Sequence, residues 1–85
     1  MQIPTIHLNG TSKEELVEAL CNARAAIDDA ITALRKTTPN GRDYYPQGPK
    51  ATEWAVAEHS VRVHKLMEVR DEIEELAVAI NEGGS

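Results

Sequence analysis

Residues 12–37 read SKEELVEALCNARAAIDDAITALRKT, and this stretch decides the fold. Its apolar side chains recur every three or four residues, which is the spacing of one face of an α-helix; they are Leu16, Leu20, Ala23, Ile27, Ala30 and Leu34. Ser12 and Glu15 form a capping box at the start of the stretch. Arg35 and Lys36 suit the negative end of a helix dipole. We therefore predict a helix over residues 12–37.

A second periodic stretch covers residues 49–81. Pro49 stands near its first helical position, where the missing N–H costs nothing, and Gly83 follows its end. A heptad stripe can be read backwards from this end; it consists of Ile80, Leu76, Ile73, Val69 and Leu66, and its next positions are Arg62 and His59. We predict a helix over residues 49–81 whose seam becomes polar toward the preceding loop.

The loop at residues 38–48 joins the two helices. A connection of this length favours an antiparallel hairpin. Equal rise along both helices then places Leu34 opposite about Glu53–Val56 and Leu16 opposite about Val69–Arg70. The chain is expected to be one all-α domain over residues 1–85, with an extended leader at residues 1–11, an overhanging end of the second helix and a short tail at residues 82–85.

The apolar surface exceeds what two helices enclose, because each helix buries only the side that faces the other. Two stripes are left over, namely Val56, Val63 and Met67 near the loop, and Ile73, Leu76 and Ile80 near the end. In the leader, Ile3, Ile6 and Leu8 are expected to cover part of the overhang. The remaining stripes require another chain, so we predict a homo-oligomeric helical bundle, a dimer at least.

Composition excludes several classes of protein. The 85 residues carry a net charge of −5, which argues against a general duplex-DNA binder. The single cysteine, Cys21, allows neither an internal disulfide nor a thiolate metal cage. His59 and His64 are five residues apart, unlike a pair of zinc ligands at i and i+4. No apolar run approaches the ~18 residues of a membrane span, and the leader lacks the features of a signal peptide. We expect a soluble cytoplasmic protein without a metal.

Signatures of catalysis are missing from the sequence. It contains no glycine-rich phosphate loop and no His-Glu-x-x-His motif, and its one cysteine, its serines and its three histidines form no plausible nucleophile set. We expect neither an enzyme nor a cofactor.

The loop and its flanks concentrate aromatic and basic residues. All three aromatic residues, Tyr44, Tyr45 and Trp54, lie within eleven positions. Four basic residues against one acid give +3 between Arg35 and Lys50, whereas residues 68–82 carry −5. The molecule is therefore expected to be electrically polar, with its basic end at the loop.

This composition suits a nucleotide-like anion. Tyr44 and Tyr45 can stack on a base, while Arg42, with Lys50 or Arg62 from the same or an adjacent chain, meets phosphate. The alternatives are that the tyrosines close the open end of the hairpin, or that the loop binds a protein.

Arg62 and His59, on the predicted seam, have two interpretations. In the first, Arg62 bonds to a carbonyl oxygen or pairs with Asp28 or Asp29 of the first helix and sets the register of an oligomer. In the second, an oligomer brings Arg62 and the loop of a neighbouring chain around one anionic ligand, with His59 as a further site residue.

Two segments, IPTIHLNGTS at residues 3–12 and NGRDYYPQG at residues 40–48, resemble a group of small tailed-phage and prophage proteins usually described as hypothetical. The resemblance covers nearly the whole chain and implies a phage protein. A weaker analogy, from size and the predicted helical oligomer, links the chain to phage sponge proteins, which sequester the cyclic nucleotide signals of bacterial defence systems.

Two functions remain open. The leading hypothesis is a non-enzymatic counter-defence protein in the host bacterial cytoplasm that sequesters a cyclic nucleotide or an ADP-ribose-like signal. The rival is an interaction or assembly protein that uses the RDYYPQG loop as an epitope for a host or virion protein. A nucleic-acid adaptor that uses the basic end is a third interpretation.

Overall fold

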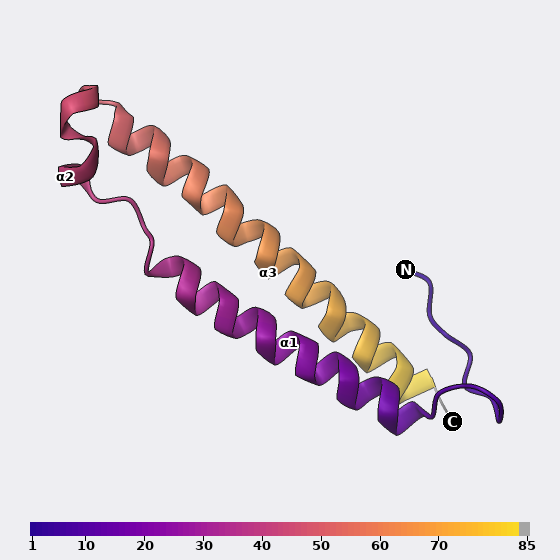
Figure 1. Ribbon diagram of the computed structural model, residues 1–85. Helices are drawn as coiled ribbons and strands as arrows, with labels where there is room; N and C mark the ends of the chain where they lie inside the picture. Colours follow the sequence, from indigo (N-terminus) through magenta and orange to yellow (C-terminus); the bar gives the residue numbers. More distant parts are fainter. Residues whose placement is uncertain (84–85) are drawn as a thin grey trace.

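The computed structural model, which describes residues 1–83, is a long antiparallel helical hairpin (Figure 1). Helix α1 (Lys13–Arg35) lies beside helix α3 (Ala51–Gly83), and the short helix α2 (Gly41–Tyr44) is followed by a 3-10 turn, η1 (Tyr45–Gln47), at the closed end. No strand occurs in residues 1–83. The predicted all-α hairpin is confirmed, with short helices inside the predicted loop. The predicted tail at residues 82–85 starts within α3, and its last two residues lie outside the described range.

The ends of α1 follow from its capping residues. The hydroxyl oxygen of Ser12 accepts a hydrogen bond from the backbone N–H of Glu15 at 3.2 Å, as the capping box predicts. At the other end the backbone N–H groups of Lys36 and Thr37 bond to carbonyls three residues back. The hydroxyl groups of Thr37 and Thr38 donate to the carbonyl oxygens of Leu34 and Arg35. These bonds end the helix at Arg35, two residues before the predicted end.

The closed end is built by turn residues. The side chain of Asn40 accepts from the backbone N–H of Arg42 at 2.9 Å and starts α2. Gly48 has φ 105° and ψ 167°, a backbone conformation that is essentially restricted to glycine. Helix α3 then begins at Ala51, two residues after the predicted start, and continues to Gly83.

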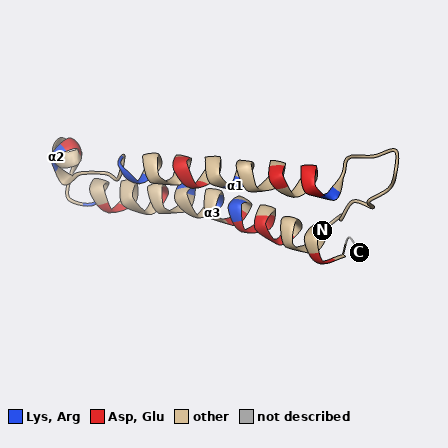
Figure 2. Ribbon diagram, turned by 90° about the horizontal axis from the view of Figure 1, so that it is seen from below, with Lys and Arg blue, Asp and Glu red and all other residues tan. Residues whose placement is uncertain are grey.

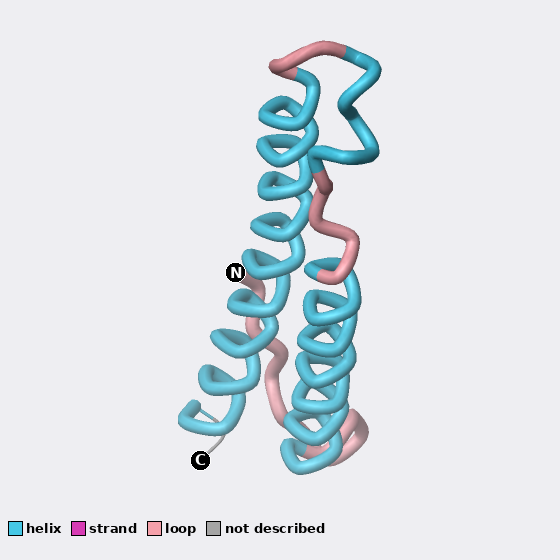
Figure 3. The backbone as a smooth tube through the Cα atoms, turned by 90° about the vertical axis from the view of Figure 1, so that its left-hand side faces the viewer, coloured by secondary structure: helices cyan, strands magenta, loops and turns pink. Residues whose placement is uncertain are grey.

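The register of the two helices differs from the predicted one. Arg70 bonds to Asp28 at 3.2 Å, and Arg24 approaches Glu74 at 3.5 Å. These contacts place Leu16 level with about Glu82, so the predicted pairing of Leu16 with Val69–Arg70 is wrong by about three and a half helical turns. The reason is the path of residues 36–40. After a turn at Lys36 and Thr37, the chain continues beside α3 through residues 38–40, called here the extended segment, instead of reversing direction at once (Figure 3).

This register moves the overhang to the closed end. Helix α3 has 33 residues and α1 has 23, and it is the first turns of α3 that extend past α1. At the other end Ile80 is only 2% exposed, so the predicted overhang there is wrong. In the leader Ile6 is half-buried and Ile3 is exposed, while Leu8 is 99% exposed and covers nothing.

The seam of α3 also differs from the predicted heptad stripe. Its inward positions are Ala55, His59, Val63, Leu66, Arg70, Ile73, Ala77 and Ile80. The seam shares His59, Leu66, Ile73 and Ile80 with the predicted stripe, but the inward positions between them are Val63, Arg70 and Ala77, each one residue later than the predicted Arg62, Val69 and Leu76. Val69 is consequently 47% exposed and Arg62 faces solvent, whereas Val63, assigned to a surplus stripe, is buried within the hairpin.

Candidate ligand-binding site at the tip

The closed end of the hairpin, called here the tip, consists of residues 36–58. It contains α2, η1 and the part of α3 that extends past α1 (Figure 1). Both α2 and η1 contact α3. The tip is therefore a small folded unit that holds its side chains against one end of a long helix.

Tyr44 and Trp54 lie on one side of the tip. They line a hollow of about 200 Å³ together with Gln47, Ala51, Ala55 and Glu58. Tyr44 is half-buried, whereas the indole of Trp54 is 65% exposed. Trp54 was not among the predicted site residues. The sequence did hold a signal for it, because Trp54 and Val61 are seven residues apart and therefore share one side of the helix, away from the seam.

Tyr45 belongs to a different part of the surface. It is 85% exposed and lines an open hollow of about 640 Å³ with Gly41, Pro46, Gly48, Pro49 and Thr52. The two adjacent tyrosines therefore line separate hollows. A single ligand ring held between Tyr44 and Tyr45 is not supported by this geometry.

The cations of the tip are exposed. Arg42, in α2, and Lys50, directly before α3, both face solvent, and neither forms an ion pair with any residue in the described part of the chain. Both side chains are thus available to an anion from outside.

His59 is not available in this way. It is buried, and its Nε2 lies 3.2 Å from the hydroxyl oxygen of Thr38. That hydroxyl donates its only hydrogen to the carbonyl oxygen of Arg35 at 2.6 Å, so it must accept from His59. His59 therefore anchors the extended segment to α3, and its Nε2 is occupied.

Arg62 lies outside the seam. Its guanidinium pairs at 3.6 Å with Glu58, the last residue of the tip, and Glu58 lines the hollow of Tyr44 and Trp54. The predicted pairing of Arg62 with Asp28 or Asp29 is wrong, because Arg70 occupies Asp28. The pKa of Arg70 is raised by its hydrogen bonds to Asp28 and, next, to Asp71, and by the charges of both carboxylates.

Charge is distributed unevenly along the hairpin (Figure 2). Residues 35–65, which comprise the tip, Arg35 and the next seven residues of α3, contain six Lys or Arg and three Asp or Glu; all other residues contain three and eleven. The segment that contains the tip therefore has a net charge of +3, and the remaining residues have −8. The predicted electrical polarity thus lies along the axis of the folded molecule.

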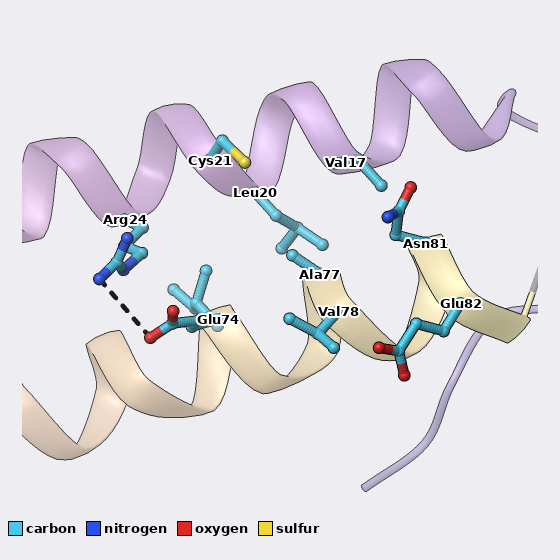
Figure 4. A pocket seen from close by; sticks show the side chains of 10 residues that line it. Val17, Leu20, Cys21, Arg24, Glu74, Ala77, Val78, Asn81 and Glu82 are labelled. Carbon is cyan, nitrogen blue, oxygen red and sulfur yellow. Dashed lines mark ion pairs between the residues drawn. The ribbon is translucent and has the colours of Figure 1, made fainter.

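An apolar groove lies at the opposite end of the molecule (Figure 4). It measures about 350 Å³ and runs between Val17, Leu20 and Cys21 of α1 and Ala77 and Val78 of α3. The Arg24–Glu74 pair stands at one end of the groove, and Nε of Arg24 is buried without a hydrogen-bond partner. The groove was not predicted from the sequence, because it exists only in the observed register.

Residues 1–83 lack two other kinds of feature. They contain no cluster of three or more His, Cys, Asp or Glu side chains placed to hold a metal ion. None of the described helices combines the length and the apolarity needed to cross a membrane.

The fold and the tip define a helical hairpin with an aromatic and cationic end. Comparisons of the chain with protein-family models, curated proteins and solved structures find no match. Function is therefore inferred from the residues of this chain.

Proposed function

We propose that this protein is a non-enzymatic binding protein that captures an anionic, nucleotide-like ligand at its tip. The observation that carries the proposal is the exposure of aromatic and unpaired cationic side chains at one end: Tyr45, Arg42 and Lys50 all face solvent within nine positions. A base stacks on an aromatic face, and phosphate accepts hydrogen bonds from guanidinium and ammonium groups.

The six predicted site residues receive different roles. We assign phosphate contacts to Arg42 and Lys50 and stacking to Tyr45. Tyr44 shapes the neighbouring hollow beside Trp54. His59 supports the tip through Thr38. Arg62 can bind an anion only if its ion pair with Glu58 breaks, so we assign it a secondary contact.

The backbone of the tip favours binding. Pro46 and Pro49 restrict φ on both sides of Gly48, and the side chain of Asn40 fixes the start of α2. A loop that is already ordered loses less conformational entropy when a ligand binds. The net charge of +3 over residues 35–65 attracts anions to this end of the molecule.

The biological role that we propose is sequestration. The resemblance of residues 3–12 and 40–48 to phage and prophage proteins supports a phage-encoded protein that acts in the host bacterial cytoplasm. Its ligand is then a nucleotide-derived signal of host defence, a cyclic nucleotide or an ADP-ribose derivative. Retention without turnover lowers the free concentration of such a signal.

Trp54 allows a direct test, because it is the only tryptophan and lies in the tip. Cyclic di- and trinucleotides and ADP-ribose derivatives are titrated into the protein while Trp54 fluorescence and heat are recorded. We expect saturable binding that weakens with added salt, and a loss of about tenfold or more in affinity for Arg42→Ala and for Tyr45→Ala. Val78→Ala, an exposed change at the other end, should bind as the unchanged protein does. No response to any of these compounds contradicts the proposal.

A second candidate is a protein-binding tip. The observation that favours it is that Tyr45 and Trp54 are the two most exposed aromatic side chains and project past the end of α1; aromatic residues are enriched at the centres of protein interfaces. Affinity capture from host lysate separates the two candidates. A host protein retained by the unchanged chain and lost with Tyr45→Ala, in the absence of nucleotide binding, favours this function.

A further inference from the structure

The hollow beside Tyr44 combines aromatic rings with hydrogen-bonding side chains. Tyr44 and Trp54 line it together with the amide of Gln47 and the carboxylate of Glu58. Its volume is about 200 Å³, which is below the ~300–1,000 Å³ of pockets that bury a whole drug-sized ligand. A hollow of this size suits a single planar ring system, such as one nucleobase.

The hydrogen-bonding groups of this hollow are free to meet a ligand. The side-chain amide of Gln47 and the phenol of Tyr44 form no hydrogen bond with any residue in the described part of the chain. The carboxylate of Glu58 approaches Arg62 through Oε2 at 3.6 Å. Because a carboxylate has about four lone-pair positions, Glu58 can accept from a ligand while Arg62 stays on Oε2.

The backbone brings these side chains together from three elements. Tyr44 ends α2, Gln47 ends η1, and Trp54 and Glu58 belong to α3. Trp54 and Glu58 are four residues apart and therefore share one side of α3. A base that stacks on the indole of Trp54 thus has the Glu58 carboxylate beside it on the same helix and the Gln47 amide across the hollow.

Guanine is the base whose edge matches this pair of polar groups. Its N1–H and its exocyclic N2–H₂ are two adjacent donors, which one carboxylate accepts together, and its neighbouring O6 accepts from an amide N–H. Adenine and cytosine place a ring nitrogen with a lone pair beside a single amino group. Uracil and thymine have one N–H between two carbonyl oxygens. Each of these four bases turns an acceptor toward the carboxylate and leaves a group unpaired.

We propose that this hollow is a guanine-specific base site, an inference that rests on the proposed function of the tip. Glu58 determines the specificity by accepting from N1–H and N2–H₂. Gln47 donates to O6, and Trp54 supplies the stacking face.

The rest of the ligand lies outside this hollow. Its phosphates meet Arg42 and Lys50, which face solvent in the same tip. The stacking assigned to Tyr45 serves a further base, because Tyr45 lines a separate hollow whose described lining residues carry no charge, and any base stacks on an aromatic face. The expected ligand is therefore a cyclic di- or trinucleotide that contains at least one guanine.

Calorimetric titration with cyclic di-GMP and cyclic di-AMP tests the base site. The two compounds have the same ring and the same charge and differ only in their bases. We expect cyclic di-GMP to bind more tightly by about tenfold or more. Cyclic di-IMP, whose bases keep N1–H and O6 but lack the N2 amino group, should fall between the two.

Glu58→Gln tests the residue that selects the base. The amide replaces one acceptor oxygen with a donor, and a glutamine amide pairs well with adenine, so the ratio of the two affinities should fall to about one or invert. The ratio is the readout because the lost negative charge acts on both ligands alike. Glu53→Gln is the matched control, since Glu53 is exposed on the same helix and lines neither hollow of the tip. It should leave the ratio unchanged.

Arg62→Met separates the carboxylate from its ion pair. This variant removes the partner of Glu58 and keeps the two acceptor oxygens, so the preference for guanine should persist. Far-UV circular dichroism verifies that all three variants remain helical.

Two kinds of result would overturn the inference. Equal or weaker binding of cyclic di-GMP relative to cyclic di-AMP, or a guanine preference that survives Glu58→Gln, overturns the guanine site and leaves the proposed function standing. Binding of an ADP-ribose derivative without binding of cyclic di-GMP has the same consequence. No binding of any of these compounds overturns the proposed function and the guanine site together.

Discussion

The imidazole of His59 donates from Nε2 to the hydroxyl oxygen of Thr38, 3.2 Å away. The direction of this bond follows from the other bond of the same hydroxyl, which donates to the carbonyl oxygen of Arg35 at 2.6 Å. The hydroxyl therefore joins the end of α1, the extended segment and a buried residue of α3. It is a single polar link at the point where the chain leaves one helix to follow the other.

Replacing Thr38 with valine should destabilise the protein. The change leaves the Nε2–H of His59 buried without an acceptor, which costs about 1–3 kcal/mol in the free energy of unfolding. Thr37→Val is the matched control, because Thr37 also donates to a carbonyl three residues back but contacts no residue of α3 through its hydroxyl. Urea unfolding at one fixed protein concentration measures both. Equal losses for the two variants would show that the His59 bond contributes nothing.

Replacing Gly48 with alanine should also destabilise the protein. At φ 105° and ψ 167° an added Cβ imposes a cost of about 1–3 kcal/mol, although no atom lies within 4 Å of its position. Gly41→Ala is the control, since its Cβ would meet only the Thr52 hydroxyl at 3.9 Å and its φ is not positive. A drop in thermal midpoint for Gly41→Ala but not for Gly48→Ala would contradict the backbone argument.

Ile80→Ala tests the observed register. Ile80 is buried at the open end of the hairpin, and truncation of a buried isoleucine costs about 2–5 kcal/mol in the free energy of unfolding. Val78→Ala, two residues earlier and exposed, should change that free energy little. In the register expected from sequence, Ile80 overhangs in a single chain. A neutral effect of Ile80→Ala in a monomeric preparation would support that register instead.

The cross-helix ion pair offers a test by salt. Asp28→Asn removes the charge that Arg70 meets at 3.2 Å, and it should lower the thermal midpoint more at low than at high ionic strength, because salt screens partly exposed pairs. Asp29→Asn changes the neighbouring carboxylate, which is exposed and pairs with no described residue. The two variants should converge as salt is added, and a constant difference between them would indicate that packing, not charge, holds Asp28.

The sequence predicted the individual helices more reliably than their pairing. Periodicity and caps are local properties, and Ser12 with its partner Glu15 starts α1 where the pattern indicates. Register depends on the path of the connection, and residues 36–40 have no periodic signal. The side chains of Thr38 and Asn40 form the hydrogen bonds that fix this path. The partner of Thr38 on α3 lies 21 positions away, however, and nothing in the local sequence indicates such a partner.

The tip illustrates the same limit for the candidate site. The predicted residues Arg42, Tyr44, Tyr45 and Lys50 do lie at one end of the molecule, because they are close in sequence. The hairpin separates Tyr44 from Tyr45 and buries His59, since both outcomes depend on how η1 and α3 pack. Val69 and Arg62 were placed inward by the heptad count, whereas the residues that follow them, Arg70 and Val63, occupy the inward positions and leave Val69 and Arg62 exposed.

The connection between the helices also orders the steps by which the chain reaches its native state. Contacts near Thr38 and His59 join residues close in sequence, whereas those between Val17 and Asn81 join nearly opposite ends of the chain. Closing a short loop costs less entropy than closing a long one, so pairing should begin at the tip and advance toward the termini. Changes in the tip should then slow folding, and changes at Ile80 should mainly accelerate unfolding.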